Sequence, residues 1–504
     1  MTSHPLRAAC LALLGLVLVA PARATWSIVV LNRVTGELAV ATSTCIANFG
    51  IDQFVPVIRV GYAAGAAQSF VLSSAANRRR IFRNSVRGAT PQQMLDVIEG
   101  SDGGFALRQF GIVAFAGPPV THTGTSNGNF ANGVIGEVGP YQYAIQGNVL
   151  TGNNVILDCE AAFLSTPGDL GEKMVAAMEA GRDAGGDGRC SCTPSAPTSC
   201  GSPPPNFNYA SYNVFMAIAR FGDTDAPCLG STGCAAGDYY LRINYAGNNS
   251  LQEPIARLRD DYTLWRASQI GRPDHVLSEV ESSIPFLQAD GTTTSHVTIR
   301  LRDIDGAALT VGGQALTVTH TGDDVATVSN IVDNGDGTHS FDLVATSTVG
   351  EGTYIITLDD GIRPVELYPH LTVGSAAPAQ LHIGQSSYSV TDGTALPLIV
   401  DRGVQDAGAM YRILGSFSGT QPGTLVGSVL VPLNRDRMFD FTQTWGGAEP
   451  FTGNAGVLDG SGRAEARFTP PAGALVGFVG STISFSAVIG ATDVTPATSL
   501  LIEL

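Results

Sequence analysis

Residues 25–30 read T-W-S-I-V-V, residues 37–42 read E-L-A-V-A-T, and the turn sequence R-V-T-G at 33–36 lies between them. Both runs are rich in β-branched and small apolar residues and flank a glycine-containing turn, a pattern typical of two neighbouring strands. Thr25 and Ser27 stand two residues apart, and alternate residues of a strand point to the same face. The sequence therefore predicts a first strand that carries two hydroxyl groups on one face.

The residues before Thr25 have the three parts of a secretory signal peptide. Arg7 supplies the positive charge, residues 11–20 form an apolar run, and A-R-A at 22–24 is a small-x-small cleavage site. We therefore predict a signal peptide at residues 1–24, with Thr25 as the first residue of the mature chain. The apolar run is too short to cross a bilayer, so we expect a secreted or periplasmic protein without a membrane span.

Composition narrows the classes of partner and of fold. Removal of residues 1–24 takes away two arginines and no acid, so the formal net charge changes from −16 to −18. A strongly acidic chain is not expected to bind nucleic acid or an anionic membrane. The 60 glycines and the low share of charged residues, 14%, favour turn-rich β structure over helical bundles.

Seven cysteines follow the predicted cleavage site, and in an oxidising compartment we expect most of them to form disulfides. Zinc binding is the alternative, but a C-x-C spacing without a nearby histidine is not a usual zinc site, so we expect no metal and no other cofactor. The odd count leaves one thiol free or bonded to another chain, and the spacing leaves the pairing open. The seven are Cys45, Cys159, Cys190, Cys192, Cys200, Cys228 and Cys234.

The rest of the N-terminal region predicts strands, then helices, then strands. Thr90-Pro91 and Gly100 mark the start and stop of one helix, and Gly181 is expected to end another. Hairpin spacing of the strands favours antiparallel sheets with helices on their faces, an α+β fold. The other predicted helices are 154–164, 169–180 and 255–265, and the other predicted strands are 57–60, 63–67, 111–115, 214–219 and 239–244.

From about residue 284 the helical signals stop, and residues 284–375 and 380–504 are expected to form two all-β sandwich domains. Residues 284–374 resemble the invasin/intimin-type bacterial Ig-like domain, notably in D-N-G-D-G-T at 333–338 before a strand. That hexapeptide lacks the glutamate that closes an EF-hand loop, so we interpret it as a tight hairpin turn. The predicted strands are 296–302, 314–319, 337–345, 352–358, 387–390, 396–400, 410–414 and 483–488.

A threonine at the mature N-terminus places a hydroxyl and a free α-amine on the same residue. The α-amine has an ordinary pKa of about 7.7–8.0, so near neutral pH it can accept the hydroxyl proton and later return it to a leaving group. This arrangement activates a nucleophile without a histidine. Signal peptidases also tolerate small residues at this position, so Thr25 is equally explained as part of a cleavage site.

An ordered run of motifs resembles domain-of-unknown-function family 1028 over about residues 25–268. Members of that family typically begin Thr-Phe-Ser-Ile-Val, close to T-W-S-I-V at 25–29, and continue into a T-G-E-L-G-V-A-V-like strand, close to 35–41. The likeness recurs further along the chain. The segments concerned are 57–69, 143–150, 179–181, 184–189, 241–243 and 254–258.

The resemblance implies an N-terminal-nucleophile (Ntn) hydrolase-like αββα sandwich at residues 25–280. In such hydrolases the first residue attacks a carbonyl, its α-amine is the base, and backbone N–H groups with a nearby Asn or Gln hold the oxyanion. By the same resemblance, the expected catalytic residues are Thr25, Asn148, Gly147 and Asp187. The expected pocket residues are Ser27, Gln68, Ser69 and Gln146.

Simpler roles remain for several of these residues, and two features depart from the wider superfamily. Gln68 and Asn148 are also explained as partners of buried backbone groups, and Asp187 as a turn residue.

The only lysine, Lys173, is expected on a helix surface, which leaves an arginine such as Arg59 to lower the amine pKa. The cysteine-rich insert at about 189–208 follows the Gly-Gly-Asp motif. We expect it to overhang the site and to alter access. Cys45 is expected to pack in the core or to form a disulfide.

Two classes of function stay open. The first is a secreted Ntn-type hydrolase of an amide or peptide bond that forms an acyl-enzyme on Thr25, with a small molecule or peptide as substrate. The second is a non-catalytic Ntn-like scaffold that acts as a binding or adhesion protein, with cell-surface or glycan contact through the β-sandwich modules.

Overall fold

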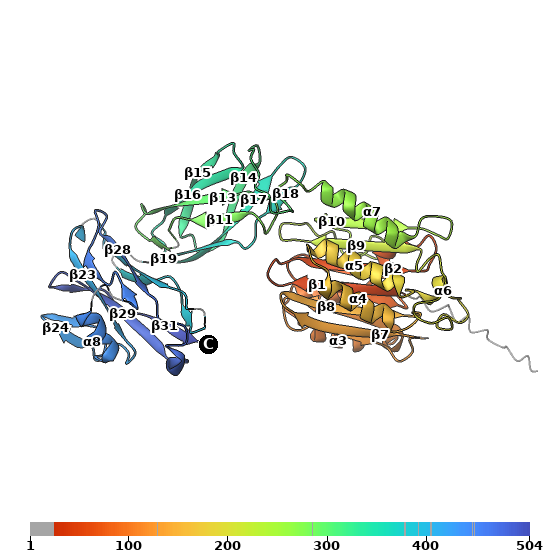
Figure 1. Cartoon of the computed structure of the whole chain (residues 1–504), viewed down its shortest axis with the longest axis horizontal. Helices are drawn as coiled ribbons and strands as arrows, with labels where there is room; N and C mark the ends of the chain where they lie inside the picture. Colours follow the sequence, from red (N-terminus) through yellow and green to blue (C-terminus); the bar gives the residue numbers. More distant parts are fainter. Residues whose placement is uncertain are drawn as a thin grey trace, which may run out of the picture. The chain divides into compact units, whose positions relative to one another are not determined.

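The computed structural model describes residues 25–504 except 129, 285, 377–379, 392, 404–405, 446 and 448. The predicted signal peptide at 1–24 lies outside the described residues. The chain divides into two compact units, with the boundary between Ser268 and Gln269 (Figure 1). Among the described residues, no helix combines the length and hydropathy needed to cross a bilayer.

The first unit is built on a six-stranded antiparallel sheet in the order β10-β9-β2-β1-β8-β7. The predicted first hairpin lies at its centre, since β1 (Thr25–Asn32) pairs with β2 (Leu38–Thr44) on one side. On its other side β1 pairs with β8 (Tyr141–Asn148). The outer strands are β7 (Asn132–Val138), β9 (Asn213–Ala219) and β10 (Leu241–Ala246).

Three helices pack on one face of this sheet. They are α4 (Asn154–Ser165), α5 (Leu170–Asp183) and α7 (Pro254–Ala267), and α4 and α5 lie across β1 and β8 (Figure 1). Trp26, Ile28 and Val30 alternate along β1 and share one buried core with these helices. Every second residue of β1 therefore packs against the apolar faces of α4 and α5, as the apolar spacing along these helices predicts.

The opposite face of the six-stranded sheet packs on a second sheet in the order β3-β4-β5-β6. Val29, Leu31, Ala64, Ala66 and Val113 belong to the core between the two sheets. Two further helices share a core with the outer face of the second sheet. The elements are β3 (Pro56–Arg59), β4 (Ala63–Ser69), β5 (Arg108–Ala114), β6 (Val120–Thr123), α2 (Ala76–Ser85) and α3 (Pro91–Glu99); α1 (Ile51–Phe54) and α6 (Gly188–Ser191) are short.

The helix α3 begins as predicted, because Thr90 and Gln93 form a reciprocal capping box and Pro91 occupies the first turn. The predicted stop at Gly181 is wrong, since α5 continues to Asp183. A side chain at Gly181 would lie 2.6 Å from Cys159 Sγ and 3.0 Å from Trp26 Nε1. Gly181 is needed for close packing inside the helix rather than for ending it.

The second unit contains two sandwiches of sheets with separate cores. In the first sandwich the predicted hairpin turn at 333–338 is confirmed, because β15 and β16 pair antiparallel across it. One of its sheets has β11 (Glu279–Ser282), β13 (Thr294–Arg300), β16 (Thr338–Ala345) and β15 (Ala326–Asp333). The other has β12 (Phe286–Gln288), β19 (Leu371–Ala376), β17 (Gly350–Asp359), β14 (Ala315–Gly322) and β18 (Pro364–Glu366).

The second sandwich differs from the prediction of an all-β module, because it contains the helix α8 (Arg437–Thr444). Asp436 caps α8 by accepting a bond from Phe439 N at 2.9 Å, and Phe439 packs with Leu414 of β23. This short segment contains two phenylalanines and two threonines, which favour strands, so the sequence did not predict a helix there. The strands are β20 (Gln380–Ile383), β21 (Ser387–Ser389), β22 (Leu396–Asp401), β23 (Met410–Ser416), β24 (Thr424–Val426), β25 (Val429–Val431), β26 (Phe451–Thr452), β27 (Ala455–Val457), β28 (Arg463–Phe468), β29 (Thr482–Ile489), β30 (Asp493–Val494) and β31 (Thr498–Glu503).

Candidate functional site

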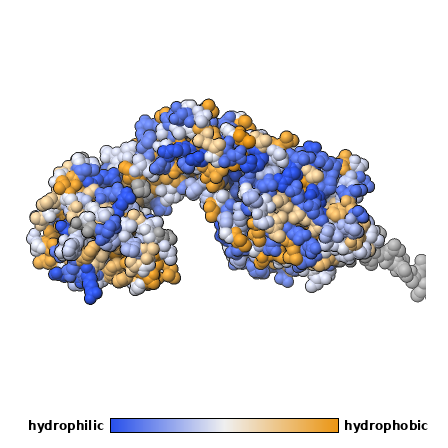
Figure 2. Space-filling view, in the orientation of Figure 1, coloured by the Kyte–Doolittle hydropathy of each residue, from blue (hydrophilic) through white to orange (hydrophobic). Residues whose placement is uncertain are grey.

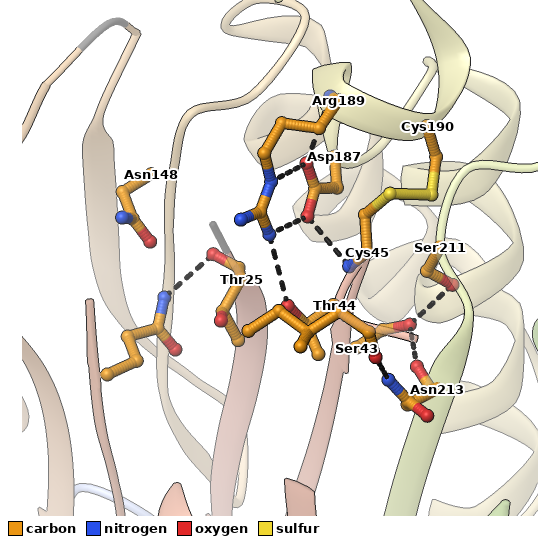
Figure 3. A network of polar contacts seen from close by, with 12 residues as sticks. Thr25, Ser43, Thr44, Cys45, Asn148, Asp187, Arg189, Cys190, Ser211 and Asn213 are labelled. Carbon is orange, nitrogen blue, oxygen red and sulfur yellow. Dashed lines mark hydrogen bonds and ion pairs between the residues drawn. A yellow bond between two sulfur atoms is a disulfide. The ribbon is translucent and has the colours of Figure 1, made fainter. Parts of the chain in front are cut away.

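Polar residues fill the end of the six-stranded sheet at which β1 begins. Thr25 pairs with Asn148 of β8, and Thr44 of β2 pairs with Asn213 of β9. Because Trp26 pairs with Ser43, the antiparallel register places Thr44 beside Thr25. Figure 3 shows Thr25 between Asn148 on one side and Thr44 on the other. The sheet thus brings a row of hydroxyl and amide groups to the predicted nucleophile.

One layer deeper, Gln68 of the second sheet reaches across to β1. The Ser27 hydroxyl lies 2.5 Å from Gln68 Oε1 and 2.8 Å from Thr42 Oγ1. Gln68 Nε2 donates to the carbonyl oxygen of Thr25 at 2.9 Å and to Gln109 Oε1 at 2.8 Å. Gln68 is 1% exposed and satisfies a buried backbone group. It therefore positions Thr25, in agreement with the simpler of its two expected roles.

Gln146 and Gly147 lie in the same buried layer of β8. The Gln146 side chain is fully buried and occupies the space over Gly111 of β5, where an added Cβ would lie 2.1 Å from Gln146 Oε1. The carbonyl oxygen of Gly147 accepts a bond from Gln109 Nε2 at 2.9 Å. Both residues are thus part of the packing between the two sheets.

Three glycines of the predicted motifs converge on the Trp26 side chain. A Cβ at Gly147 would lie 3.1 Å from Trp26 Cβ, and one at Gly181 would lie 3.0 Å from Trp26 Nε1. A Cβ at Gly186 would lie 2.8 Å from Trp26 Cη2. Since Trp26 follows Thr25 directly, these glycines fix the position of the strand that begins at Thr25.

Asn148 and Ser69 face each other from the two sheets. Asn148 Nδ2 donates to Ser69 Oγ at 3.2 Å, and both residues are at most 1% exposed. Ser69 has a φ of +72°, which a non-glycine residue rarely adopts. The strained turn after β4 therefore presents the Ser69 hydroxyl to the amide opposite Thr25.

An ion pair lies on the other side of Thr25 (Figure 3). The Asp187 carboxylate is fully buried and accepts bonds from Arg189 Nε at 3.1 Å, Arg189 Nη2 at 2.7 Å and Cys45 N at 2.8 Å. Arg189 Nη2 also lies 3.4 Å from Thr44 Oγ1. Asp187 is therefore the anchor of Arg189, and the guanidinium stands between that carboxylate and the hydroxyl row.

Disulfides determine how the cysteine-rich insert is held. Cys45 at the end of β2 is bonded to Cys190, the residue after Arg189 (Figure 3). The other pairs are Cys192–Cys200 and Cys228–Cys234. Cys159 is the free thiol, and its burial raises its pKa to about 12. The insert is thus tied to the strand beside Thr25, and the odd cysteine is a core residue of α4.

The basic residues considered from the sequence lie elsewhere. Arg59 forms an ion pair with Asp225 at 3.0 Å. Its neighbour in the sheet is Ala63, the first residue of β4, whereas Gln68 and Ser69 lie at the other end of that strand. Lys173 donates to the carbonyl oxygen of Thr166. Arg59 therefore lies away from Thr25, whereas Arg189, which the sequence analysis did not single out, lies beside Thr44. The available signal was its place directly after the Gly-Gly-Asp-Gly motif and before Cys190.

Comparison with known proteins divides the chain into two matched segments. Residues 25–197 match the model of the family of unknown function DUF1028, and residues 274–365 match the model of invasin, domain 3. The first match ends before residues 241–258, which the sequence resemblance had included. No curated protein matches.

Solved structures with similarity to this chain include members of both groups. Protein SPO2555 from Silicibacter pomeroyi, described as DUF1028, is 19% identical over 49% of this chain and 94% of its own, with a TM-score of 0.34. The adhesin InvE of Yersinia pseudotuberculosis is 16% identical over 45% of this chain and 59% of its own, with a TM-score of 0.18. The bacterial integrin-binding protein invasin is 12% identical over 57% of this chain and 45% of its own, with a TM-score of 0.19.

The motifs around Thr25 lie within the first family-model match, and strands β11 to β17 lie within the second. The chain is thus similar to the DUF1028 family over residues 25–197 and to invasin, domain 3, over residues 274–365.

Proposed function

We propose that the first unit, residues 25–268, forms a secreted Ntn-type hydrolase of an amide or peptide bond, with the Thr25 hydroxyl as nucleophile. The observation that carries the proposal is the position of Thr25. It is the first residue of the central strand β1, directly after a predicted signal-peptide cleavage site, and it lies between Asn148 and the Arg189–Asp187 pair (Figure 3). In the full-length chain its nitrogen belongs to a peptide bond, so cleavage after Ala24 is the step that creates the base.

The fold supports the same assignment. Two sheets pack face to face, with α4, α5 and α7 on one outer face and α2 and α3 on the other. The resemblance to DUF1028 implies an αββα sandwich of the Ntn type, and this layer order is compatible with it. The nucleophile then lies at the polar end of the space between the two sheets.

The proposed reaction needs only groups of this chain, the substrate and water. The free α-amine takes the hydroxyl proton as Thr25 Oγ bonds to the carbonyl carbon of the substrate, and the carbonyl oxygen becomes an oxyanion. The ammonium then protonates the leaving amine as the carbon–nitrogen bond breaks, which leaves an ester on Thr25. Water cleaves the ester by the same proton route and regenerates the hydroxyl.

Asn148 and Arg189 have separate roles in this scheme. The Asn148 amide lies opposite Thr25 and is the proposed donor to the oxyanion. Gln146 and Gly147 pair with β1 on one side and with β7 on the other, so their backbone is engaged in the sheet. The Arg189 guanidinium is the proposed electrostatic group, because a nearby positive charge disfavours the protonated amine and lowers its pKa. Asp187 acts through Arg189, whereas Ser27, Gln68 and Gln146 support the strand beneath. Ser69 lines the edge of the site.

The decisive experiment is labelling of the exported chain by a hydroxyl-directed β-lactone, after N-terminal sequencing has identified the first residue. We expect the sequence to start at Thr25 and one lactone to bind per chain. Thr25→Ala should abolish the label and Thr25→Ser should retain it. Thr263→Ala, which removes an exposed threonine of α7, should label like the wild type. A different first residue, or a label that survives Thr25→Ala, would contradict the proposal.

A second candidate function is adhesion, and the match of residues 274–365 to an invasin domain favours it. Three disulfides and an invasin-type domain also support an extracellular or periplasmic location. Figure 2 shows hydrophobic residues dispersed among hydrophilic ones on the visible face of the second unit. Met410 and Leu425 are exposed hydrophobic residues of this unit. Binding of the full Thr25→Ala chain to a cell surface or glycan array, without labelling of the wild type, would favour the adhesin.

A further inference from the structure

A second polar feature of the first unit lies where the start of α2 meets the residues that follow β4, and it borders on Gln68, the side chain that bonds to the Thr25 carbonyl oxygen. A cavity of about 10 Å³ lies there. Its lining combines apolar side chains such as Phe54 and Leu72 with the polar side chains of Gln68, Asn77, Arg78 and Arg108. Such a volume holds about one water-sized occupant. The cavity therefore has room for one small occupant only.

Arg78 is a buried cation of this cavity. Its side chain is 2% exposed, Nη2 donates to the carbonyl oxygen of Leu72 at 3.2 Å, and Nη1 has no hydrogen-bond partner among the described residues. Among the ion pairs between described residues, none includes Arg78. The ring of Phe54 lies 5.8 Å from the guanidinium carbon and offers weak compensation.

Arg108, which also lines the cavity, differs from Arg78 because its positive charge is balanced by a carboxylate. Its Nε lies 2.8 Å from Asp102 Oδ2, and it also donates to the carbonyl oxygen of Phe70. By contrast, burial and the neighbouring Arg79 lower the pKa of Arg78 to about 10, so that Arg78 still carries its charge near neutral pH. A buried charge without a counter-charge is costly, and the open Nη1 donor adds to that cost.

We propose that this cavity binds one small monovalent anion, a halide or a single carboxylate group, through the Arg78 guanidinium. The anion supplies the missing negative charge and accepts the free Nη1–H bond. The aromatic and aliphatic walls favour a weakly hydrated anion, since little water is left to solvate it. The proposal does not depend on the chemistry of Thr25.

The test is the thermal midpoint of the exported chain in sodium bromide or chloride, compared with sodium gluconate at equal ionic strength. Gluconate is too large for the cavity, so only a specific site separates the salts. We expect a saturable rise on the order of 3–5 °C in wild type at about ten times the Kd. Arg79→Met, which removes the next arginine of α2, should keep the rise, and Arg78→Met should lose it.

Two further arms separate the sources of the anion and guard against a variant that does not fold. A saturable rise with formate but not with halide would identify a carboxylate as the natural occupant. If Arg78→Met fails to fold, anomalous scattering from wild-type crystals in bromide gives the answer, with a peak expected at hydrogen-bond distance from Nη1. Equal effects of all the salts, or an empty cavity in bromide, would overturn the proposal.

Discussion

The space between the sheets differs in chemistry between the two units. In the first sandwich of the second unit that space is filled by apolar side chains such as Phe341, Leu343, Tyr354 and Ile356. In the first unit the equivalent space ends in amides and hydroxyls that bond from one sheet to the other, as Gln68 does to the Thr25 carbonyl. Buried polar networks are costly unless every member is satisfied, so their position is informative. The difference points to the Thr25 end as the part of the molecule shaped by function.

The largest expected effect is that of Trp26→Ala compared with Phe485→Ala. Both side chains are fully buried, Trp26 under α4 and α5 and Phe485 in the second sandwich. Each should lower the free energy of unfolding of its own unit by about 3–5 kcal/mol. Only Trp26→Ala should also slow lactone labelling, because it releases the strand that carries Thr25. Calorimetry and labelling rates measure the two effects. If both variants lost labelling equally, the position of Thr25 would not depend on the core of the first unit in particular.

The second prediction concerns the disulfide that ties the insert to β2. The double variant Cys45→Ser, Cys190→Ser should lose about 2–4 kcal/mol of stability, since this bond closes a separation of 145 residues. It should also reduce labelling at Thr25, because Arg189 adjoins Cys190. The control removes Cys228–Cys234, which spans six residues, and should cost less stability and leave labelling unchanged. Cys159 should stay unmodified by alkylating reagents in both folded chains, given its buried thiol with a pKa of about 12.

Sequence reasoning located the elements that carry local signals and missed those that depend on long-range contacts. The β1–β2 hairpin, the capped start of α3 and the hairpin at 333–338 follow from short motifs, and the structure contains all three. The predicted helix end at Gly181 was wrong because this glycine is needed for close contact with Trp26. The spacing of residues along one helix cannot reveal such a contact. Arg189 was missed for the same reason, since its partner strand is about 145 residues away in sequence.

The third prediction tests the buried polar layer itself. Gln68→Leu keeps the size of the side chain but removes the donor to the Thr25 carbonyl and the contact to Ser27. We expect a loss of about 1–3 kcal/mol in the free energy of unfolding, because the Thr25 carbonyl and the Ser27 hydroxyl each lose a buried hydrogen-bond partner. The matched change Gln92→Leu on the exposed side of α3 should stay within about 0.5 kcal/mol. A neutral Gln68→Leu in denaturant titrations would mean that the layer is not a tight network.

The smallest effect, and the most specific to catalysis, is a shift of the pH profile. Removal of Arg189 alone would leave Asp187 buried and uncompensated, so the double variant Asp187→Asn, Arg189→Met is compared with Asp187→Asn alone, from which it differs only in the positive charge. Arg189→Lys is compared with the wild type. The reactive form of Thr25 has a neutral amine, so the labelling rate rises as pH passes the amine pKa. Loss of the guanidinium should raise that pKa, which moves the rising limb to higher pH by about one unit.

At pH values below both pKa values the double variant should therefore label about tenfold more slowly, and above both values the rates should converge. Arg189→Lys retains the positive charge and should keep the wild-type limb. A merely structural role for Arg189 would lower the rate equally at every pH. In that case the Asp187–Arg189 pair would serve only to hold the insert in place. The α-amine of Thr25 and the neighbouring Asn148 amide would then be sufficient to activate Thr25.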